Sequence, residues 1–366
     1  MSAAPTTTGA RLKLPTRCLV ALSTALLAAS VTFALPAASD AAQAPKGFFG
    51  VHPRALDSAD YPMMASSDVG LIRTGFVYAA VRPSEGAPFD WSRYDTVVGG
   101  AADQGIDVLP VLLGVPPWLS TKRGATPLDS PAAKAAWRDF LTAAVSRYGP
   151  GGTFWDTYPG TPHPIEDWQA WNEPNSFNNW KRPSPRGYGK LLALSAKTIH
   201  GVDPGANVIS AGVISQPVNR KAMDGDVYLK KMLKSRKAAK AADGIAIHPY
   251  TGTVRQVRKQ IELTRKVMDK AKLKRTPIWV TEIGWGQGPG GKNPLIVPAA
   301  KQRRNLRDSF QMTLKKRRKL RISKVVWYQW RDGLDEVCGW CNTSGLLRED
   351  GTAKALLGEF EAIARR

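Results

Sequence analysis

Two glutamates, Glu173 and Glu282, each follow a strand-like run and have the residue type needed for paired acid and nucleophile chemistry. Glu173 lies in the pentapeptide 171–175, directly after Asn172, where a run that begins at Ile165 gives way to a loop. Glu282 ends the run 276–281. Cleavage of a glycosidic bond needs a proton for the leaving oxygen and a carboxylate opposite the charge that develops at the anomeric carbon. Two glutamates at two strand ends therefore predict glycoside hydrolysis.

The elements that must position this pair alternate regularly along the chain. Helical stretches fall between strand-like runs, no Pro/Ser linker interrupts them, and we therefore predict one α/β domain. The strand-like runs are 47–52, 71–76, 107–113, 165–172, 207–212, 244–248, 277–281 and 323–330. The main helical stretches are 92–104, 131–147, 184–199, 226–240, 253–274, 299–319 and 353–364.

Eight strand-helix repeats favour a single (β/α)8 TIM barrel. A doubly wound open sheet is the alternative architecture. It is disfavoured because no Gly-x-Gly-x-x-Gly turn follows the first strand and no phosphate-binding loop is recognisable. In a barrel the carboxyl ends of all strands meet at one face, so residues distant in sequence converge there. The residues expected at this face besides the two glutamates are Arg73, Trp118, Asn172, His248, Tyr250 and Trp330.

The two glutamates should differ in protonation. Arg73 and Tyr250 are expected next to Glu282, and both favour its charged form, so we assign Glu282 as nucleophile. Glu173 has fewer evident positive neighbours and is assigned as acid/base. Carboxyl groups roughly 5 Å apart would lead to a covalent intermediate, whereas a gap of roughly 6.5 to 9.5 Å would admit a water and invert configuration.

Aromatic and imidazole side chains supply candidates for substrate binding. The apolar face of a pyranose can stack on an indole, and Trp118, Trp285 and Trp330 are the expected platforms among twelve tryptophans. His52 and His248 are expected to hydrogen-bond a sugar hydroxyl or a carboxylate. We predict no metal site, because the four histidines form no His-x-x-x-His or His/carboxylate cluster in sequence.

The N-terminal segment is typical of a secretory signal. Basic residues precede an apolar stretch from Cys18 to Leu35, and small residues follow up to Ala41. We expect cleavage after residues 1–41, a catalytic domain of 42–366, and a secreted protein with no membrane segment; an uncleaved anchor is the alternative. In an oxidising compartment Cys338 and Cys341 would form a small disulfide.

The net charge of +22 is concentrated in one part of the sequence. Residues 221–324 hold 28 Lys and Arg against 7 Asp and Glu. This basic flank is either a solvated outer face or a surface that attracts an anionic polymer, such as an acidic polysaccharide or cell-wall phosphate. Nucleic acid is disfavoured by the expected export and by the lack of interleaved aromatic and basic residues.

The sequence resembles the clan A glycoside hydrolases in the segments 89–95, 171–175, 247–250 and 281–285. It looks closest to family 39 and its polysaccharide-cleaving endoglycosidase relatives, with the cellulase-containing family 5 next. The resemblance implies a retaining (β/α)8 enzyme with Glu173 as acid/base and Glu282 as nucleophile. It also implies Asn172 near the sugar 2-hydroxyl, Arg73 and Tyr250 around the nucleophile, and Trp330 at the subsite floor.

The sequence therefore predicts a secreted retaining glycosidase that acts by double displacement, within a β-linked oligo- or polysaccharide and without metal or organic cofactor. The alternative is a non-catalytic extracellular protein on the same barrel that binds carbohydrate or associates with the cell wall. The presence of both glutamates favours the enzyme.

Overall fold

The computed structural model of the chain describes residues 44–215, 222–334 and 338–365. The signal predicted for residues 1–41 and Cys18 lie outside the described residues, so the signal stays a prediction. Among the described residues, no helix is both long enough and apolar enough to cross a bilayer.

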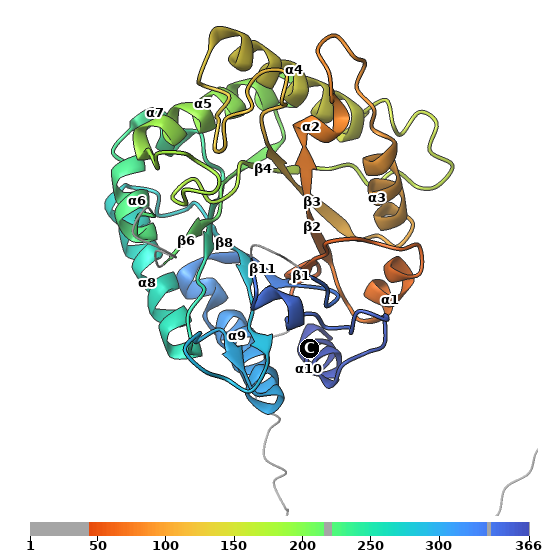
Figure 1. Cartoon of the computed structure of the whole chain (residues 1–366), viewed down its shortest axis with the longest axis vertical. Coiled ribbons are helices and arrows are strands. Elements are labelled where there is room, and N and C mark those ends of the chain that lie inside the picture. Colours follow the sequence, from red (N-terminus) through yellow and green to blue (C-terminus); the bar gives the residue numbers. More distant parts are fainter. Residues whose placement is uncertain (1–43, 216–221, 335–337, 366) are drawn as a thin grey trace, which may run out of the picture. The chain divides into compact units, whose positions relative to one another are not determined.

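Nine parallel strands form one sheet that curls on itself (Figure 1). Their order is β5-β4-β3-β2-β1-β11-β8-β7-β6, and Ser210 N donates to Gly244 O at 2.9 Å, so that β5 also meets the segment before β7. The predicted α/β barrel is confirmed, and β6 is a short addition beside β7. The strands are β1 (Phe49–His52), β2 (Leu71–Val77), β3 (Asp107–Leu113), β4 (Asp167–Ala170), β5 (Asn207–Ser210), β6 (Val213–Ile214), β7 (Ile245–His248), β8 (Ile278–Ile283) and β11 (Ile322–Tyr328).

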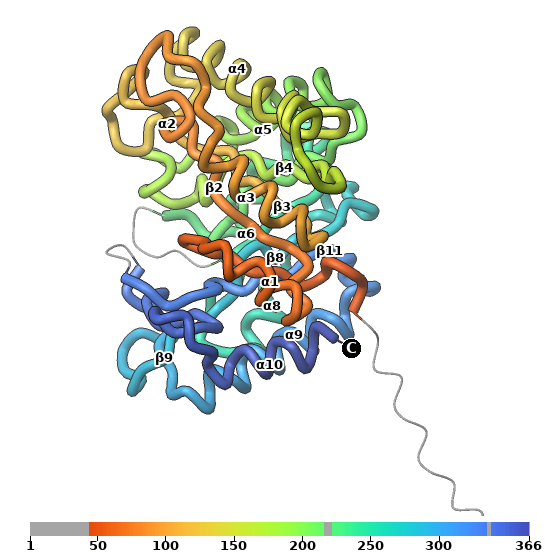
Figure 2. Tube along the Cα trace, turned by 90° about the vertical axis from the view of Figure 1, so that its right-hand side faces the viewer, coloured from red at the N-terminus to blue at the C-terminus, as the bar shows by residue number. Residues whose placement is uncertain are grey.

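Helices cover the outer face of the strands (Figures 1 and 2). The stretch predicted as one helix at 226–240 is two helices, because the first ends at Met232 and Ser235 caps the second by accepting from Ala238 N. The helices are α1 (Asp60–Ser66), α2 (Tyr78–Val81), α3 (Ser92–Ala102), α4 (Pro131–Tyr148), α5 (Pro185–Val202), α6 (Gly225–Met232), α7 (Arg236–Lys240), α8 (Val254–Lys270), α9 (Ala299–Leu320) and α10 (Ala355–Ala364). Two short strands, β9 (Gly286–Gln287) and β10 (Ile296–Val297), and the 3-10 turn η1 (Cys341–Thr343) lie in the loops.

Local sequence accounts for where α4 and α5 begin. Ser130 and Ser184 precede prolines at the first helical position of α4 and α5, and each serine hydroxyl accepts a backbone N–H at 3.0 Å. A serine cap satisfies one otherwise unpaired amide, and proline there has no amide to lose. In α8 one face is apolar and packs on the barrel, since Val257, Ile261 and Met268 are fully buried.

A small apolar cluster fills the inside of the barrel below the predicted site. Its six buried side chains come from six different strands and are separate from the larger core between sheet and helices. Alternate residues of a strand point to opposite faces, so Leu71 and Arg73 of β2 share the inner face while Ile72 joins the outer core. The cluster consists of Leu71, Leu109, Ile209, Ala246, Trp279 and Val326.

Candidate active site

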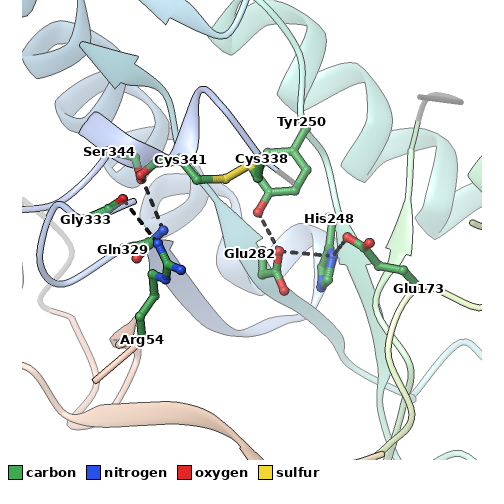
Figure 3. Close-up of a disulfide and its surroundings, with 10 residues drawn as sticks. All are labelled: Arg54, Glu173, His248, Tyr250, Glu282, Gln329, Gly333, Cys338, Cys341 and Ser344. Carbon is green, nitrogen blue, oxygen red and sulfur yellow. Dashed lines mark hydrogen bonds and ion pairs between the residues drawn. A yellow bond between two sulfur atoms is a disulfide. The ribbon is translucent and has the colours of Figure 1, made fainter. Parts of the chain in front are cut away.

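The carboxyl ends of β4, β7 and β8 bring Glu173, His248 and Glu282 into one row (Figure 3). His248 Nδ1 lies 2.7 Å from Glu173 Oε1 and 3.4 Å from Glu282 Oε2. One oxygen of Glu173 and one of Glu282 lie within 4.8 Å of each other. The two glutamates, about a hundred residues apart in sequence, are therefore neighbours across one imidazole.

The backbone that presents Glu173 is locally strained. Trp171 and Glu173 have φ values of 78° and 42°, a left-handed region that non-glycine residues rarely occupy. Their amides are held by Leu112 O at 2.9 Å and Gly212 O at 3.0 Å, respectively. Such strain costs of the order of 1–3 kcal/mol and clusters at functional sites.

Arg73 is the hub of the hydrogen-bond network under the two glutamates. Its side chain is 1% exposed. Nη1 donates to Glu282 Oε1 at 2.7 Å and lies 3.1 Å from His52 Nδ1. Nε donates to Gln169 Oε1 at 2.7 Å, and Nη2 donates to Asn172 Oδ1 at 2.8 Å. The guanidinium thus fixes the nucleophile candidate and orients Asn172.

His248 is enclosed on its other side. Its Nε2 lies 3.1 Å from Thr281 Oγ1, and a Cβ added to Gly212 would lie 2.0 Å from the same nitrogen. Only a glycine leaves room for the imidazole here. With the proton on Nδ1, His248 donates to Glu173, and Nε2 can accept from the Thr281 hydroxyl.

The two carboxyl groups are driven toward opposite protonation states. Burial raises the pKa of Glu173 above its ordinary value, and this outweighs the contacts with His248. Burial also disfavours the charged form of Glu282, but His248, Arg73 and His52 and the hydrogen bond from Tyr250 lower its pKa to about 2. Tyr250 Oη donates to Glu282 Oε2 at 2.5 Å. Glu173 is thus suited to donate a proton and Glu282 to attack as a carboxylate.

The same three residues are the group of ligand-type side chains that could hold a metal ion in the described part of the chain. Their surroundings fit an acid/base pair better. Both oxygens of Glu282 already accept hydrogen bonds, one of them from the permanently charged Arg73, which would repel a cation.

A cavity of about 430 Å³ opens over the row of carboxylates. One wall is a short loop in which Cys338 and Cys341 are joined by a disulfide, with Cα atoms 5.4 Å apart (Figure 3). Trp340 lies in this loop. The other lining residues are Asn172, Glu173, Ser176, Asn178, Ile214, Tyr250, Glu282, Asn293, Leu295, Tyr328 and Gly339.

The sequence profile of one protein family, described as glycosyl hydrolase catalytic core, matches residues 170–360 of the chain. This match spans more than half of the 366 residues and includes both glutamates. The chain belongs to the glycosyl hydrolase catalytic core family. The predicted membership in the glycoside hydrolases is thereby confirmed. A search of curated proteins found no match for this glycosyl hydrolase.

Solved structures agree on the fold of the glycosyl hydrolase. It is similar to a family 39 glycoside hydrolase from the gut symbiont Bacteroides cellulosilyticus WH2, with TM-score 0.64 and 21% identity over 87% of this chain and 63% of that one. A monomeric β-xylosidase from Caulobacter crescentus CB15 has TM-score 0.62 and 15% identity over 87% of this chain and 68% of that one. GH5_18 from Streptomyces cattleya, solved in complex with GlcNAc, has TM-score 0.64 and 15% identity over 89% and 80% of the two chains.

The family 39 and GH5_18 neighbours are clan A enzymes, as the sequence resemblance indicates. The glycosyl hydrolase spans less than two thirds of the family 39 enzyme's length.

Seven of the predicted site residues of the glycosyl hydrolase meet at this place in the barrel. His52 joins through Arg73 and stacks on Tyr328 with ring centroids 4.9 Å apart. Burial and the neighbouring Arg73 lower the pKa of His52 to about 3, so this imidazole is neutral. The seven residues are His52, Arg73, Asn172, Glu173, His248, Tyr250 and Glu282.

The prediction that Trp285 and Trp330 are sugar platforms is wrong. Both are fully buried, and their indole N–H groups donate to Thr251 O at 2.8 Å and to Asp60 Oδ1 at 2.9 Å. For Trp330 the reason is register: β11 ends at Tyr328, two residues earlier than predicted, and the chain then carries Trp330 into the core.

Trp118 also does not line the cavity. Its ring packs edge-on against Tyr78, with centroids 6.2 Å apart, and its N–H donates to Arg82 O at 3.1 Å.

Four residues that contact the predicted site residues were not found from the sequence. Gln169 and Thr281 are buried polar residues within apolar strands, which is the signal that would have identified them. Tyr328 lines the cavity at the place predicted for Trp330. Trp340 comes from a loop, where no periodicity indicates which way a side chain points.

Proposed function

We propose that this protein is a retaining glycosidase in which Glu173 is the acid/base and Glu282 the nucleophile. The observation that carries the proposal is the distance of less than 4.8 Å between carboxylate oxygens whose pKa values are shifted in opposite directions. Retaining enzymes have carboxyl groups about 5–5.5 Å apart, whereas inverting enzymes need about 6.5–9.5 Å to admit a water.

The reaction then has two displacements. Ionised Glu282 attacks the anomeric carbon while Glu173 gives its proton to the leaving glycosidic oxygen, and a glycosyl ester on Glu282 forms. A water next attacks the same carbon as Glu173 takes its proton, and Glu282 leaves as a carboxylate. Arg73 and Tyr250 hold Glu282 in place through both steps. Asn172 uses its carbonyl oxygen toward Arg73, so its amide protons are left for a sugar hydroxyl.

We further propose that the substrate is a β-linked polysaccharide cut within the chain. The β-xylosidase among the structural neighbours supports the β linkage. The resemblance to family 39 and its endoglycosidase relatives supports cleavage within the chain. The cavity also extends past the glutamates to hydroxyl and amide side chains on Ser176, Asn178 and Asn293, which suit additional sugar units.

Chemical rescue tests the nucleophile. Glu282→Ala should lose hydrolysis of 4-nitrophenyl β-glycosides, and azide should restore part of it with an α-glycosyl azide as product. The matched control is Glu349→Ala, which removes an exposed glutamate that does not line the cavity and should leave activity unchanged. Full activity of Glu282→Ala would exclude Glu282 as nucleophile. A wild-type protein that binds but hydrolyses no glycan in a polysaccharide panel would favour the non-catalytic carbohydrate-binding alternative.

We propose that the protein is secreted after removal of residues 1–41. The support is the composition of that segment, together with the disulfide, because such bonds persist in oxidising compartments. Mass spectrometry of the protein from culture medium should find a mature N-terminus at or next to Ala42. A chain that retains residues 1–41 and stays with the cells would contradict this.

We also propose that the basic flank binds an acidic polysaccharide. A groove of about 560 Å³ lies where α5 packs on α6 and α7, and five cations but no carboxylate line it. Among the described residues these cations form no ion pair, whereas Arg258 on α8 pairs with Glu262 at 3.6 Å. The five cations are Lys231, Lys234 and Lys237 of the basic flank and Arg186 and Lys190 of the neighbouring α5.

Retention on immobilised polygalacturonate should fall steeply as salt rises, because exposed charges are screened within about 10 Å at 0.1 M salt. The triple variant Lys231→Glu, Lys234→Glu, Lys237→Glu should elute earlier than a control with the same charge change on α9, Lys301→Glu, Lys315→Glu, Lys319→Glu. Equal elution of the two variants would show that net charge, and not the groove, governs retention.

A further inference from the structure

The loop that carries Trp340 is fixed to the barrel at one end. Cys341 is buried, and its amide donates to Cys338 O at 2.9 Å within the turn that the disulfide closes. The carbonyl of Cys341 accepts from Ser344 Oγ at 2.9 Å and from Gln329 Nε2 at 3.3 Å (Figure 3). Because the disulfide links Cys338 to the anchored Cys341, both ends of the four-residue loop are held.

Two glycines make the slot in which Trp340 lies. A Cβ on Gly286 would lie 2.0 Å from Trp340 O, and one on Gly284 would lie 3.3 Å from the indole Cζ3. Gly284 follows Glu282 by two residues. The loop thus packs directly on the backbone that carries the nucleophile.

The exposed part of Trp340 continues an aromatic wall of the cavity. Its ring centroid is 4.9 Å from that of Tyr250 and 5.9 Å from that of Tyr328. Tyr250 in turn donates to Glu282. A sugar whose anomeric carbon faces Glu282 therefore has the half-buried indole beside it, and a pyranose offers an apolar face that fits such a surface.

We propose that Trp340 is a substrate-binding residue of the pyranose site and that the Cys338–Cys341 disulfide holds it in the binding position. This inference rests on the proposed glycosidase function. It adds that substrate affinity depends on a disulfide outside the catalytic pair, so that reduction of this disulfide weakens substrate binding while the chemical step continues.

A different role for Trp340 would be to position Tyr250 against Glu282. The two roles have different kinetic signatures. Loss of a binding wall raises KM and leaves the acid limb of the kcat profile in place. Loss of Tyr250 positioning lowers kcat and moves that limb upward, because Glu282 loses a hydrogen bond to its charged form.

The experiment compares oxidised and phosphine-reduced full-length protein on 4-nitrophenyl β-xyloside, β-glucoside and β-galactoside, with the best of the three used for kinetics. Reduction should raise KM by about tenfold, keep kcat within about twofold, and reverse on reoxidation. The Cys338→Ser, Cys341→Ser double variant should show the raised KM without reductant and no response to it. Trp340→Ala should raise KM at least as much, and Trp340→Phe should recover part of the affinity.

Leu334→Ala is the matched control, because Leu334 belongs to the same connection but is 79% exposed and outside the cavity. Its KM should equal that of the wild type. An unchanged KM after reduction, with two more free thiols than in the oxidised protein found by mass spectrometry, would refute the role of the disulfide. An unchanged KM in folded Trp340→Ala would refute the role of Trp340 in substrate binding. A fall in kcat with a shifted acid limb would assign Trp340 to positioning. Failure of the glycosidase proposal is separate, since it would appear as equal activity of wild type and Glu282→Ala.

Discussion

Replacement of Arg73 by methionine should destabilise the protein and change how its stability depends on pH. The substitution keeps a long apolar side chain but removes the guanidinium that donates to Glu282, Asn172 and Gln169. Removal of one partner of a buried ion pair lowers the unfolding free energy by about 3–5 kcal/mol, because the remaining charge is left without compensation. The whole lowering of the Glu282 pKa from 4.5 to about 2, to which Arg73 contributes beside His248, His52 and Tyr250, corresponds to about 3 kcal/mol at about 1.4 kcal/mol per pH unit.

The direction of the pH effect follows from the lowered pKa of Glu282. A folded-state pKa below the unfolded value stabilises the protein above the unfolded pKa, and this contribution is lost as the pH falls through the folded value. The difference in unfolding free energy between wild type and Arg73→Met should thus be near 3 kcal/mol at pH 7. It should shrink below about pH 4, since Glu282 is then protonated in the variant.

Urea denaturation between pH 3 and pH 8, read by tryptophan fluorescence, measures this difference. Arg258→Met is the control, because Arg258 is 48% exposed and its ion pair with Glu262 should contribute less than about 1 kcal/mol. A loss of stability in Arg73→Met that is equal at all pH values would refute the reasoning. It would mean that Arg73 stabilises the barrel by packing and not through the charge of Glu282.

Three further changes have defined outcomes. Glu173→Gln should lower kcat/KM on glycosides with poor leaving groups by about 10²- to 10⁴-fold and remove the basic limb of the pH–rate profile. A basic limb that persists in the variant would show that another group is the acid. Tyr250→Phe should move the acid limb of that profile upward by about one pH unit, because a hydrogen bond to a charged group contributes about 1.5–3 kcal/mol; an unmoved limb would separate Tyr250 from nucleophile control. Gly212→Ala should lower the unfolding free energy by about 1–3 kcal/mol, since its Cβ would collide with His248. Gly201→Ala is the control: a Cβ at this position of α5 has no atom within 4 Å, so the unfolding free energy should rise by up to about 1 kcal/mol. Calorimetry that finds equal stability for the two variants would contradict the packing around His248.

The barrel could be predicted because its signals are local. Each strand is a short apolar run, and the acidic and basic residues that matter follow directly where a run ends, as Glu282 does after Val280 and Thr281. Arg73 was also predictable, because a charged residue inside an apolar strand must meet an opposite charge in the folded protein.

The aromatic part of the site could not be predicted in the same way. Trp330 was assigned to the cavity from its place near a predicted strand end. The strand ends two residues earlier, and Trp330 lies in the core. Trp340 reaches the cavity through a disulfide and two glycines on another loop, and these tertiary contacts have no periodic signature. Site residues at strand ends could thus be predicted from the sequence, whereas site residues on loops could not.

The connections of Arg73 bear on how activity could be lost during evolution. Glu282 is 8% exposed and bonded to both Arg73 and Tyr250, whereas Glu173 is 18% exposed and its side chain contacts His248. A lineage that keeps the barrel only to bind sugars can therefore replace Glu173 at small structural cost, but it must change Glu282 and Arg73 together. We expect inactive descendants of this fold to retain Glu282. Its presence in a relative's sequence then indicates a stable barrel, and only the residue at position 173 indicates whether that relative is catalytic.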